Sequence, residues 1–466
     1  MTSKPLYFTN MLKLTVMPIN LEERIGYLKK LLNKIESERT LIKNIVSSDY
    51  NKPDAEIDFT EIIPVVSEIR FVVKNLHKWL RPKRKSRTLL HFNAKASVVF
   101  QPKGLVLIIA PWNYPFSLCI GPLISAIAAG NRVIIKPSEF TPNTAELIKK
   151  LISDVFPDDV VHVETGGVEV SKKLTSLPFN HIFFTGSPSV GKLVMKAASE
   201  HLTSVTLELG GKSPCILDDN FSSESFANRV IWGKFINAGQ TCIAPDYILI
   251  PETRKQEVVE QLIKKLHERF PDLKIKNQTN CSYTKIVNNS HTKRLAHLLE
   301  DAQGKGAKIE YGGEVIEDQS FLSPTILSNV NDSMDVHLEE VFGPILSIYT
   351  YTTVDEAIQF IQEKPRPLAT YLFSRNSKVI DTFMSRIRTG ALVTNDVLSH
   401  YVHKNLPFGG VNNSGIGRSH GYYGVKEFSN EMAFLKTGYG PVGADIIKQP
   451  YSNRVKSLID KAVKYL

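Results

Sequence analysis

One thiol of this chain, Cys242, lies in a run of small and polar residues that covers positions 237–246. A cysteine thiolate attacks carbonyl carbons and also leaves readily from a thioester, so such a residue can carry covalent acyl chemistry. Structural cysteines usually sit among apolar residues as small hydrophobes, whereas Gly239 and its neighbours leave room for a substrate to approach the sulfur. The stretch is therefore compatible with a nucleophile. Taken alone, it is equally compatible with a loop cysteine that has no chemical task.

Two further polar side chains supply what a nucleophilic thiol needs. Asn113 follows Pro111 at the end of an apolar run, where its amide could donate a hydrogen bond to a developing oxyanion. Glu208 is close to Gly210 and Gly211, which leave its carboxylate open to a water molecule that it could activate as a general base. Together these residues offer a thiol nucleophile, a hydrogen-bond donor for an oxyanion and a carboxylate open to water.

A second group of residues suits a nucleotide. Residues 186–191 follow a strand-like run and open a helix expected over 192–198, the setting in which backbone amides bind phosphate. Their glycine spacing differs from the dinucleotide fingerprint, and Leu193 lacks the hydroxyl that the phosphate loop of nucleoside triphosphatases requires. Lys136 and Glu139 follow the run 133–135 and could hold ribose hydroxyls at the edge of a sheet. A solvated ion pair at a strand end is the other interpretation of these two side chains.

The segments that must position these residues alternate between strand-like and helical. The strand-like runs of the first half are 104–110, 133–135, 160–163 and 181–184. Helical spacing between them, as in 141–155, predicts an open, doubly wound α/β sheet. After Glu208 the pattern starts afresh, with runs 215–217 and 247–250 around a helix of about 225–237, and with a long helix over 254–270. We therefore expect a second α/β domain that begins near 207–211.

The N-terminal region predicts helices only. Asn20 and Glu23 form a capping box, and apolar residues from Leu21 to Ile35 recur at helical spacing. Further helices are expected around 41–46 and over 64–80. We interpret all of these helices as packing elements without chemistry of their own.

Composition excludes several classes of protein. The chain has 466 residues, a formal net charge of +10 and 22% charged residues, which are ordinary values for a soluble protein of two or three domains. No apolar run approaches the roughly 18–20 residues that span a bilayer, and the N-terminus has no signal-peptide core. The four cysteines (Cys119, Cys215, Cys242 and Cys281) lie far apart. Their spacing disfavours a disulfide framework or a zinc cluster and indicates a reducing, cytoplasmic location.

Three local patterns, a basic cluster, a histidine pair and a C-terminal amphipathic helix, have ordinary structural explanations. The basic cluster 81–87 is expected to be a solvated linker, with a phosphate-binding patch as the alternative, and no nucleic-acid partner is expected. His400 and His403 form an HxxH pair without a third ligand, so no metal site is predicted. Residues 455–464 form an amphipathic helix that is expected to dock on the protein or on a partner subunit; weak contact with a membrane surface is the alternative.

Taken in order, seven motifs resemble the aldehyde dehydrogenase superfamily. They lie at residues 111–115, 136–139, 184–191, 207–212, 239–242, 340–344 and 407–410, and the resemblance covers nearly all of the chain. Residues 205–208 and 242–247, with the short N-terminus, resemble the class 3 branch of fatty, aromatic and coniferyl aldehyde dehydrogenases. This resemblance implies NAD(P)-dependent oxidation of a hydrophobic aldehyde, either medium- or long-chain aliphatic or aromatic, to its carboxylic acid.

The same resemblance implies a role for each site residue. Cys242 would attack the aldehyde, Asn113 and the Cys242 backbone amide would stabilise the oxyanion of the thiohemiacetal, and Glu208 would activate the water that hydrolyses the thioester. The implied cofactor contacts are Lys136, Glu139, Gly186, Ser187, Gly191, Glu340 and Phe342, and the implied substrate contacts are Tyr114 and His400. NAD is expected, with NADP possible, because the Glu139 carboxylate would repel a 2′-phosphate.

The resemblance also implies a domain layout and a homodimer. The layout has a Rossmann-like cofactor domain (1–80 and 102–207), a catalytic domain (208–405), an oligomerisation element (81–101 and 425–445) and a tail (446–466). Two alternatives stay open. A CoA-acylating dehydrogenase would use coenzyme A in place of water, although that branch generally lacks the base at Glu208. A non-catalytic homologue would keep the fold, although the intact set of Cys242, Glu208 and Asn113 argues against it.

Overall fold

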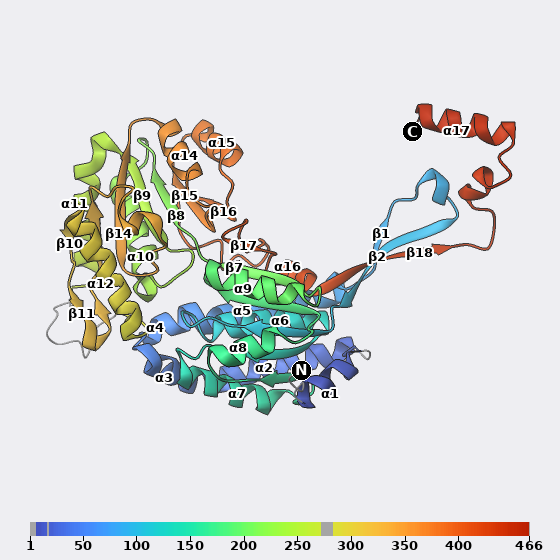
Figure 1. Ribbon diagram of the computed structural model, residues 1–466, viewed down its shortest axis with the longest axis horizontal. Helices are drawn as coiled ribbons and strands as arrows, with labels where there is room; N and C mark the ends of the chain where they lie inside the picture. The colour runs from blue at the N-terminus through green and yellow to red at the C-terminus, as the bar shows by residue number, and fades with distance from the viewer. Residues whose placement is uncertain (1–5, 16–17, 272–282, 466) are drawn as a thin grey trace.

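Two open α/β sheets and a projecting arm make up the computed structural model, which describes residues 6–15, 18–271 and 283–465 (Figure 1). Cys281 lies outside these residues. The sheets meet near the middle of the molecule, and the arm carries the C-terminus away from both. The predicted α/β class, with a doubly wound first sheet and a second α/β unit, is confirmed.

The first sheet has six strands in the order β17-β7-β6-β3-β4-β5. Their bounds are Gly415–Ile416, Ser204–Leu209, His181–Gly186, Leu105–Ile109, Arg132–Lys136 and Val161–Val163. All pairs are parallel except β17 with β7. Strands β3 and β4 are buried along their whole length, which explains their continuous apolar runs. Because Glu208 lies in β7, it belongs by its pairing to this sheet.

Helices cover both faces of the first sheet. One face packs on helices α2 (Leu21–Ser37), α3 (Arg39–Tyr50), α5 (Ile63–Trp79), α6 (Ser117–Ala129) and α7 (Pro142–Val155). The other face packs on α1 (Leu6–Leu14), α8 (Val168–Thr175) and α9 (Pro188–Ser199). Between α3 and α5 the chain passes through α4 (Asp54–Ile57) and a π-helical turn, η1 (Asp58–Ile62). The capping box at Asn20 is present as predicted.

The second sheet has seven strands in the order β10-β13-β14-β9-β8-β15-β16. Their bounds are Lys308–Tyr311, Thr325–Ser328, Ile345–Tyr351, Pro245–Pro251, Ser213–Leu217, Ala369–Phe373 and Ala391–Thr394. One face packs on α10 (Ser223–Phe235), α11 (Lys255–Arg269) and α12 (Asn289–Gly304). The opposite face packs on α14 (Val354–Gln362) and α15 (Ser377–Arg386). A short helix, α13 (Asp335–Leu338), and a two-stranded sheet of β11 (Val315–Ile316) with β12 (Phe321–Leu322) complete this half.

The arm is a three-stranded antiparallel sheet in the order β1-β2-β18. Strands β2 (Ala94–Pro102) and β18 (Ser429–Thr437) pair along nine residues and project from the body (Figure 1). The interpretation of residues 81–87 as a linker is wrong in part, because Lys83–Lys85 form β1. The ammonium of Lys83 lies 4.1 Å from the centre of the Tyr422 ring, in α16 (Gly421–Glu427), and so anchors the base of the arm.

The C-terminal helix α17 (Asn453–Tyr465) lies at the far end of the arm, as Figure 1 shows. None of its described side chains is buried, and Val463 keeps 82% of its surface exposed. The amphipathic helix expected here is present, but it does not dock on the body of its own chain. Among the described residues, no helix is long and apolar enough to cross a membrane.

Candidate active site

The loop before Cys242 has an unusual backbone that the chain holds rigidly. After α10 ends, a 3₁₀ turn over Ile236–Gly239 places Asn237 and Ala238 at φ values of 53° and 50°. Left-handed backbone at two non-glycine residues costs free energy and is found most often at functional sites. The side chain of Gln240 fixes the loop, because its amide donates to the carbonyls of Asn237 and Lys285 at 3.0 Å each. These two hydrogen bonds fix the loop that carries Cys242.

The side chain of Cys242 lies where three cavities meet, since it lines each of them. Burial raises the pKa of the thiol to about 12, with further contributions from the carboxylates of Glu340 and Glu208. The backbone N–H groups of Cys242 and Ile243 oppose this rise in pKa because they point toward the sulfur. Burial thus favours the neutral thiol over the thiolate.

Hydrogen bonds to both its side chain and its main chain fix Asn113 in place. Its side-chain amide donates to the carbonyl of Gln240 at 3.0 Å. Its own main-chain carbonyl accepts from the hydroxyl of Tyr50 and from the amide of Asn237, both at 2.8 Å. A carboxamide fixed in this way, 3% exposed and beside the Cys242 loop, can donate its second N–H to an oxyanion without reorganising.

Glu208 is a buried carboxyl with one free oxygen. Its Oε1 accepts a hydrogen bond from the Ser419 hydroxyl at 2.9 Å, and its Oε2 is buried without a partner. Burial raises the pKa of Glu208 to about 8, although Ser419 and Arg418 act in the opposite direction. Glu208 lines two of the three cavities that Cys242 lines. A carboxyl with a pKa near neutrality and an unoccupied oxygen is suited to accept a proton from water.

A cavity of about 500 Å³ lies at the carboxyl ends of the first sheet. Trp112, which follows β3, and Gly186, the last residue of β6, line this cavity. Ser187, the N-cap of α9, lines it as well, so the N-terminus of α9 faces the cavity. From the second half, Glu340 and Phe342 line it. A dinucleotide fits this lining in two respects: α9 offers a helix N-terminus to phosphate, and the cavity follows the strand ends of a doubly wound sheet.

Glycine is required at one point of this cavity. A Cβ on Gly210 would lie 2.1 Å from a carboxylate oxygen of Glu340, so the missing side chain makes room for that carboxylate. The Gly211 backbone N–H donates to Glu340, whose pKa burial raises to about 8. Phe342, at φ 44°, sets its ring edge-on to Trp112, with ring centres 5.4 Å apart.

Three of the residues expected at the cofactor lie off this lining. Gly191 sits inside α9, which begins at Pro188 and not at Lys192, and a Cβ there would meet Leu209 at 2.7 Å. That glycine therefore allows close packing of α9 on β7. Lys136, the last residue of β4, pairs with Glu139 at 2.5 Å, and neither side chain lines the cavity. The Lys136 side chain is 2% exposed and that of Glu139 is 31% exposed, so only the carboxylate of this pair reaches solvent.

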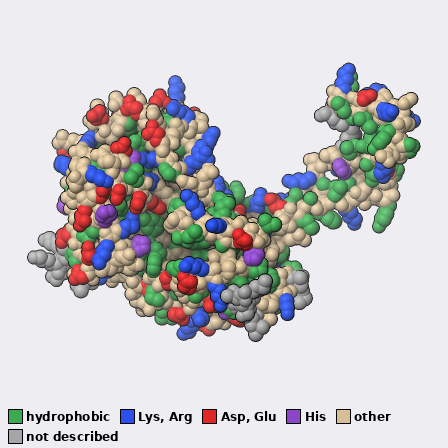
Figure 2. Space-filling view, viewed as in Figure 1, with side chains coloured by type: hydrophobic (Ala, Val, Ile, Leu, Met, Phe, Trp, Pro, Cys, Tyr) green, Lys and Arg blue, Asp and Glu red, His purple; other side chains and the backbone are tan. Residues whose placement is uncertain are grey.

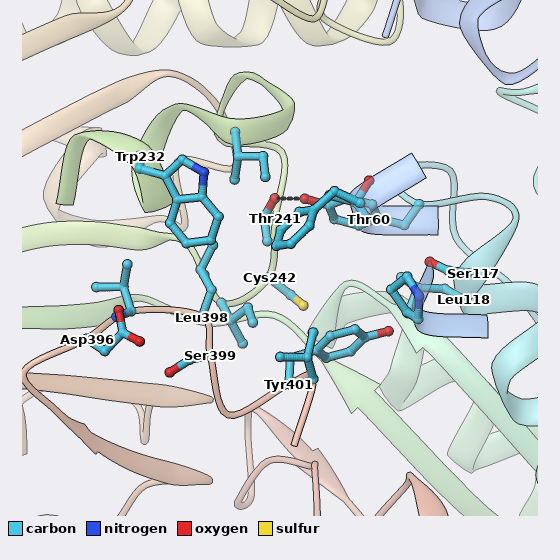
Figure 3. Close-up of a pocket in the computed structure, with 17 residues that line it drawn as sticks. Thr60, Ser117, Leu118, Trp232, Thr241, Cys242, Asp396, Leu398, Ser399 and Tyr401 are labelled. Carbon is cyan, nitrogen blue, oxygen red and sulfur yellow. Dashed lines mark hydrogen bonds between the residues drawn. The ribbon is translucent and has the colours of Figure 1, made fainter. Parts of the chain in front are cut away.

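A smaller, largely apolar cavity of about 190 Å³, called the tunnel below, also reaches Cys242, and Figure 3 shows the side chains that line it. Its apolar and aromatic walls include Phe59, Leu118, Trp232, Ile243, Leu398 and Tyr401. Tyr114 lines the tunnel, and its hydroxyl bonds to that of Thr241 at 2.6 Å. His400 does not line it; its ring stacks on Phe408 with both nitrogens buried and unpartnered.

The N-terminal helices contribute more than packing, which corrects the expectation from sequence. The ammonium of Lys52 bonds to Glu61 at 3.1 Å, and both side chains are fully buried. Glu61 in turn accepts the backbone N–H groups of Phe116 and Ser117 at the start of α6. The Lys52 ammonium lies 4.1 Å from the centre of the Tyr114 ring. Lys52 and Glu61 lie between the helices expected at 41–46 and 64–80, and Glu61 accepts from residues 55 and 56 positions away, so no local pattern marked them in the sequence.

Within the part of the chain that the structure describes, no group of three His, Cys, Asp or Glu side chains could hold a metal ion. The described cysteines Cys119, Cys215 and Cys242 are free.

Comparison with known proteins agrees with this geometry. The sequence profile of the Aldehyde dehydrogenase family matches residues 15–433. The chain is 43% identical over 408 residues to 4,4′-diaponeurosporen-aldehyde dehydrogenase of Staphylococcus aureus, covering 88% of each protein. It is 41% identical to aldehyde dehydrogenase family 3 member A2 of Pongo abelii, covering 93% of this chain and 88% of that one.

Solved structures show the same fold. The substrate-bound state of Staphylococcus aureus AldH superposes with a TM-score of 0.92 at 40% identity, covering 98% of both chains. The aldehyde dehydrogenase of Mycobacterium tuberculosis in complex with NAD⁺ superposes with a TM-score of 0.84 at 26% identity, covering 93% of this chain and 90% of that one. The resemblance read from seven short motifs is confirmed, including its class 3 character: the chain belongs to the aldehyde dehydrogenase family.

Proposed function

We propose that this protein oxidises hydrophobic aldehydes to carboxylic acids with NAD(P)⁺, through a thioester on Cys242. The observation that carries the proposal is the position of that side chain, which lines the dinucleotide-sized cavity and the apolar tunnel together. An aldehyde that enters by the tunnel meets the sulfur at the point where the cofactor cavity also ends. No other described cysteine has this position, since Cys119 and Cys215 are fully buried.

In the first step, the Cys242 thiol gives its proton to solvent water, its sulfur adds to the aldehyde carbon, and the oxygen that becomes negative is held by Asn113 and by the Cys242 backbone N–H. One such donor typically lowers the barrier by about 2.7–4 kcal/mol. A nicotinamide cofactor bound in the larger cavity would take up the hydride of the aldehyde carbon. Gly186, Ser187, Glu340 and Phe342 would hold it there.

In the second step, Glu208 accepts a proton from water, whose oxygen attacks the thioester carbon while the carbon–sulfur bond breaks. The unpartnered Oε2 of Glu208 is the atom available for this proton. This buried base argues against coenzyme A as the acyl acceptor. If coenzyme A stimulated turnover and an acyl-CoA accumulated, the CoA-acylating alternative would replace this step.

The aldehyde class follows from the tunnel. Trp232, Phe59 and Leu398 offer apolar surface to a chain or an aromatic ring, and burial of such surface contributes about 25 cal/mol per Å². Purified protein should therefore reduce NAD⁺ with aliphatic aldehydes at a kcat/KM that rises with chain length. No NADH or NADPH from any aliphatic or aromatic aldehyde would refute the proposal, and Cys242→Ala serves as its control.

We further propose a cytoplasmic homodimer in which the arm is the contact surface. Phe434 and Leu435 on β18 are 48% and 50% exposed, and Tyr439 beyond them is fully exposed. Exposed apolar side chains gathered along one element mark an interaction surface. Figure 2 shows hydrophobic side chains along the projecting arm. The free thiols of the described cysteines fit a reducing compartment.

A further inference from the structure

A third cavity extends from Cys242 and Glu208 away from the cofactor. Its volume is about 60 Å³, and its lining includes Glu68, Ser419 and His420. One water molecule needs roughly 10–15 Å³ of such a volume, and this space has polar groups to bond it. Neither the tunnel nor the cofactor cavity includes Glu68, Ser419 or His420 in its lining.

A fourth cavity continues the third toward solvent. Its volume is about 220 Å³, and it shares Glu68 and His420 with the third cavity. Ile63 and Val402 also line it, and both are more than half exposed. The fourth cavity therefore opens at the surface, where it has a wall in common with the aldehyde tunnel.

The groups along this passage can carry a proton. The Ser419 hydroxyl donates to Glu208 at 2.9 Å, and Glu68, 7% exposed, accepts the Gly421 N–H at 2.6 Å. Burial raises the pKa of Glu68 and lowers that of His420 to about 4. The other charged or titratable groups nearby are Arg418 and Glu427 beside Glu208, Lys404 beside Glu68 and His400 beside His420. Tyr401 also lines both cavities, and its ring contacts that of His420.

Hydrolysis leaves one proton per turnover on a buried carboxyl. The water oxygen bonds to the thioester carbon, the carbon–sulfur bond breaks, and one water proton stays on Glu208. At that moment the acyl chain fills the tunnel and the dinucleotide fills the larger cavity. The third and fourth cavities are then the open connection from Glu208 to solvent among the cavities described here.

We propose that this proton leaves Glu208 through the passage lined by Ser419, His420 and Glu68, with Glu68 as the group that passes it to solvent. The inference rests on the proposed role of Glu208 in thioester hydrolysis. Glu68 acts through water and never touches substrate, so it is a positioning and proton-transfer residue rather than a catalytic one.

The test uses p-nitrophenyl octanoate, which acylates a thiol without any cofactor and leaves a medium-length acyl chain to occupy the tunnel. The burst of p-nitrophenolate measures acylation, and the steady phase measures hydrolysis of the acyl-enzyme. Glu68→Gln keeps an acceptor for the Gly421 N–H but cannot shuttle the proton. With saturating NADH in the larger cavity, we expect the steady phase to slow by about tenfold or more, within the range of lost proton-transfer catalysis. Without NADH, that cavity is open to water and we expect less than about twofold slowing.

Three comparisons make the result specific. Glu36→Gln, an exposed carboxyl on α2 paired with Arg70, should change neither phase. His420→Asn should repeat the NADH-dependent slowing, because asparagine tolerates the positive φ of 71° at this position. Small buffer bases such as imidazole should restore the rate of Glu68→Gln with NADH present.

Equal slowing of Glu68→Gln with and without NADH would show a structural role and overturn the proposal, and so would an unchanged rate in both conditions. If Glu68→Gln does not fold, His420→Asn takes its place: equal slowing with and without NADH, or an unchanged rate in both conditions, would then overturn the proposal. Failure of the proposed function is distinguishable, because in that case Glu208→Gln itself would hydrolyse the acyl-enzyme at the wild-type rate.

Discussion

Replacing Glu208 by Gln removes the proposed base while it preserves size and the hydrogen bond from Ser419. The pKa of Glu208 is raised to about 8, so about one tenth of the molecules carry the carboxylate at pH 7 and about nine tenths at pH 9. Wild-type hydrolysis of the acyl-enzyme should accordingly rise about tenfold between these two pH values. The hydrolysis rate rises with pH because Glu208 can act as a base only when it is deprotonated, which occurs above its pKa.

Glu208→Gln should hydrolyse the acyl-enzyme about 10²–10⁴-fold more slowly, with a rate that no longer rises through pH 8. Acylation should persist, because Cys242 and Asn113 are unchanged, and loss of a nearby carboxylate lowers the thiol pKa. Stopped-flow release of p-nitrophenolate, with burst and steady phases fitted separately at each pH, measures both steps. A Gln variant that keeps the tenfold rise, or a wild type that shows none, would refute this assignment of the base.

Four further changes test other parts of the account. Asn113→Ala should slow acylation about 10²–10³-fold with an unchanged KM, since one oxyanion donor is lost; an unchanged burst rate contradicts this role. Tyr50→Phe removes one of the donors to the Asn113 carbonyl, and we expect it to lower the free energy of unfolding by about 1 kcal/mol. The melting temperature should fall, and kcat should fall several-fold. A kcat/KM that stays at the wild-type value would show that Asn113 needs no such support. Trp232→Ala should raise KM about tenfold or more for long-chain and aromatic aldehydes, because the lost side chain is part of the apolar wall of the tunnel. The KM for acetaldehyde should stay nearly unchanged. An equal rise in KM for acetaldehyde and for long-chain aldehydes would show that the substrate binds elsewhere. Phe434→Asp on the arm should convert a dimer to a monomer in light scattering after size-exclusion chromatography; an unchanged mass would exclude β18 as the contact surface.

Much of the fold was predictable because its core strands are continuous apolar runs. Strand β3 is buried along its whole length, and the sequence shows this directly. The start of α9 was missed by four residues, because Pro188 opens the helix and Ser187 caps it, whereas the glycine pattern pointed to a loop up to Gly191. Helix α1 was not predicted at all, since Lys13 interrupts its apolar residues.

The site was predictable only as far as short motifs reach. Cys242, Asn113 and Glu208 stand in recognisable local patterns, and the fold brings them to one junction of cavities. Lys52 and Glu61 carry no local signal, because their role depends on contacts that tertiary structure alone creates. The same holds for Glu68, which meets Gly421 across 353 positions of sequence.

The central claim, a thioester on Cys242 at the meeting point of tunnel and cofactor cavity, can be tested by trapping that species. Glu208→Gln, mixed with NAD⁺ and a medium-chain aldehyde, should accumulate an acyl group on the protein. Intact mass spectrometry should show the mass of one acyl group, and peptide mapping should place it on the peptide that contains Cys242. The double variant Glu208→Gln, Cys242→Ala should show no added mass. An unmodified Glu208→Gln protein that still produces NADH, or an acyl group on another residue, would contradict the account.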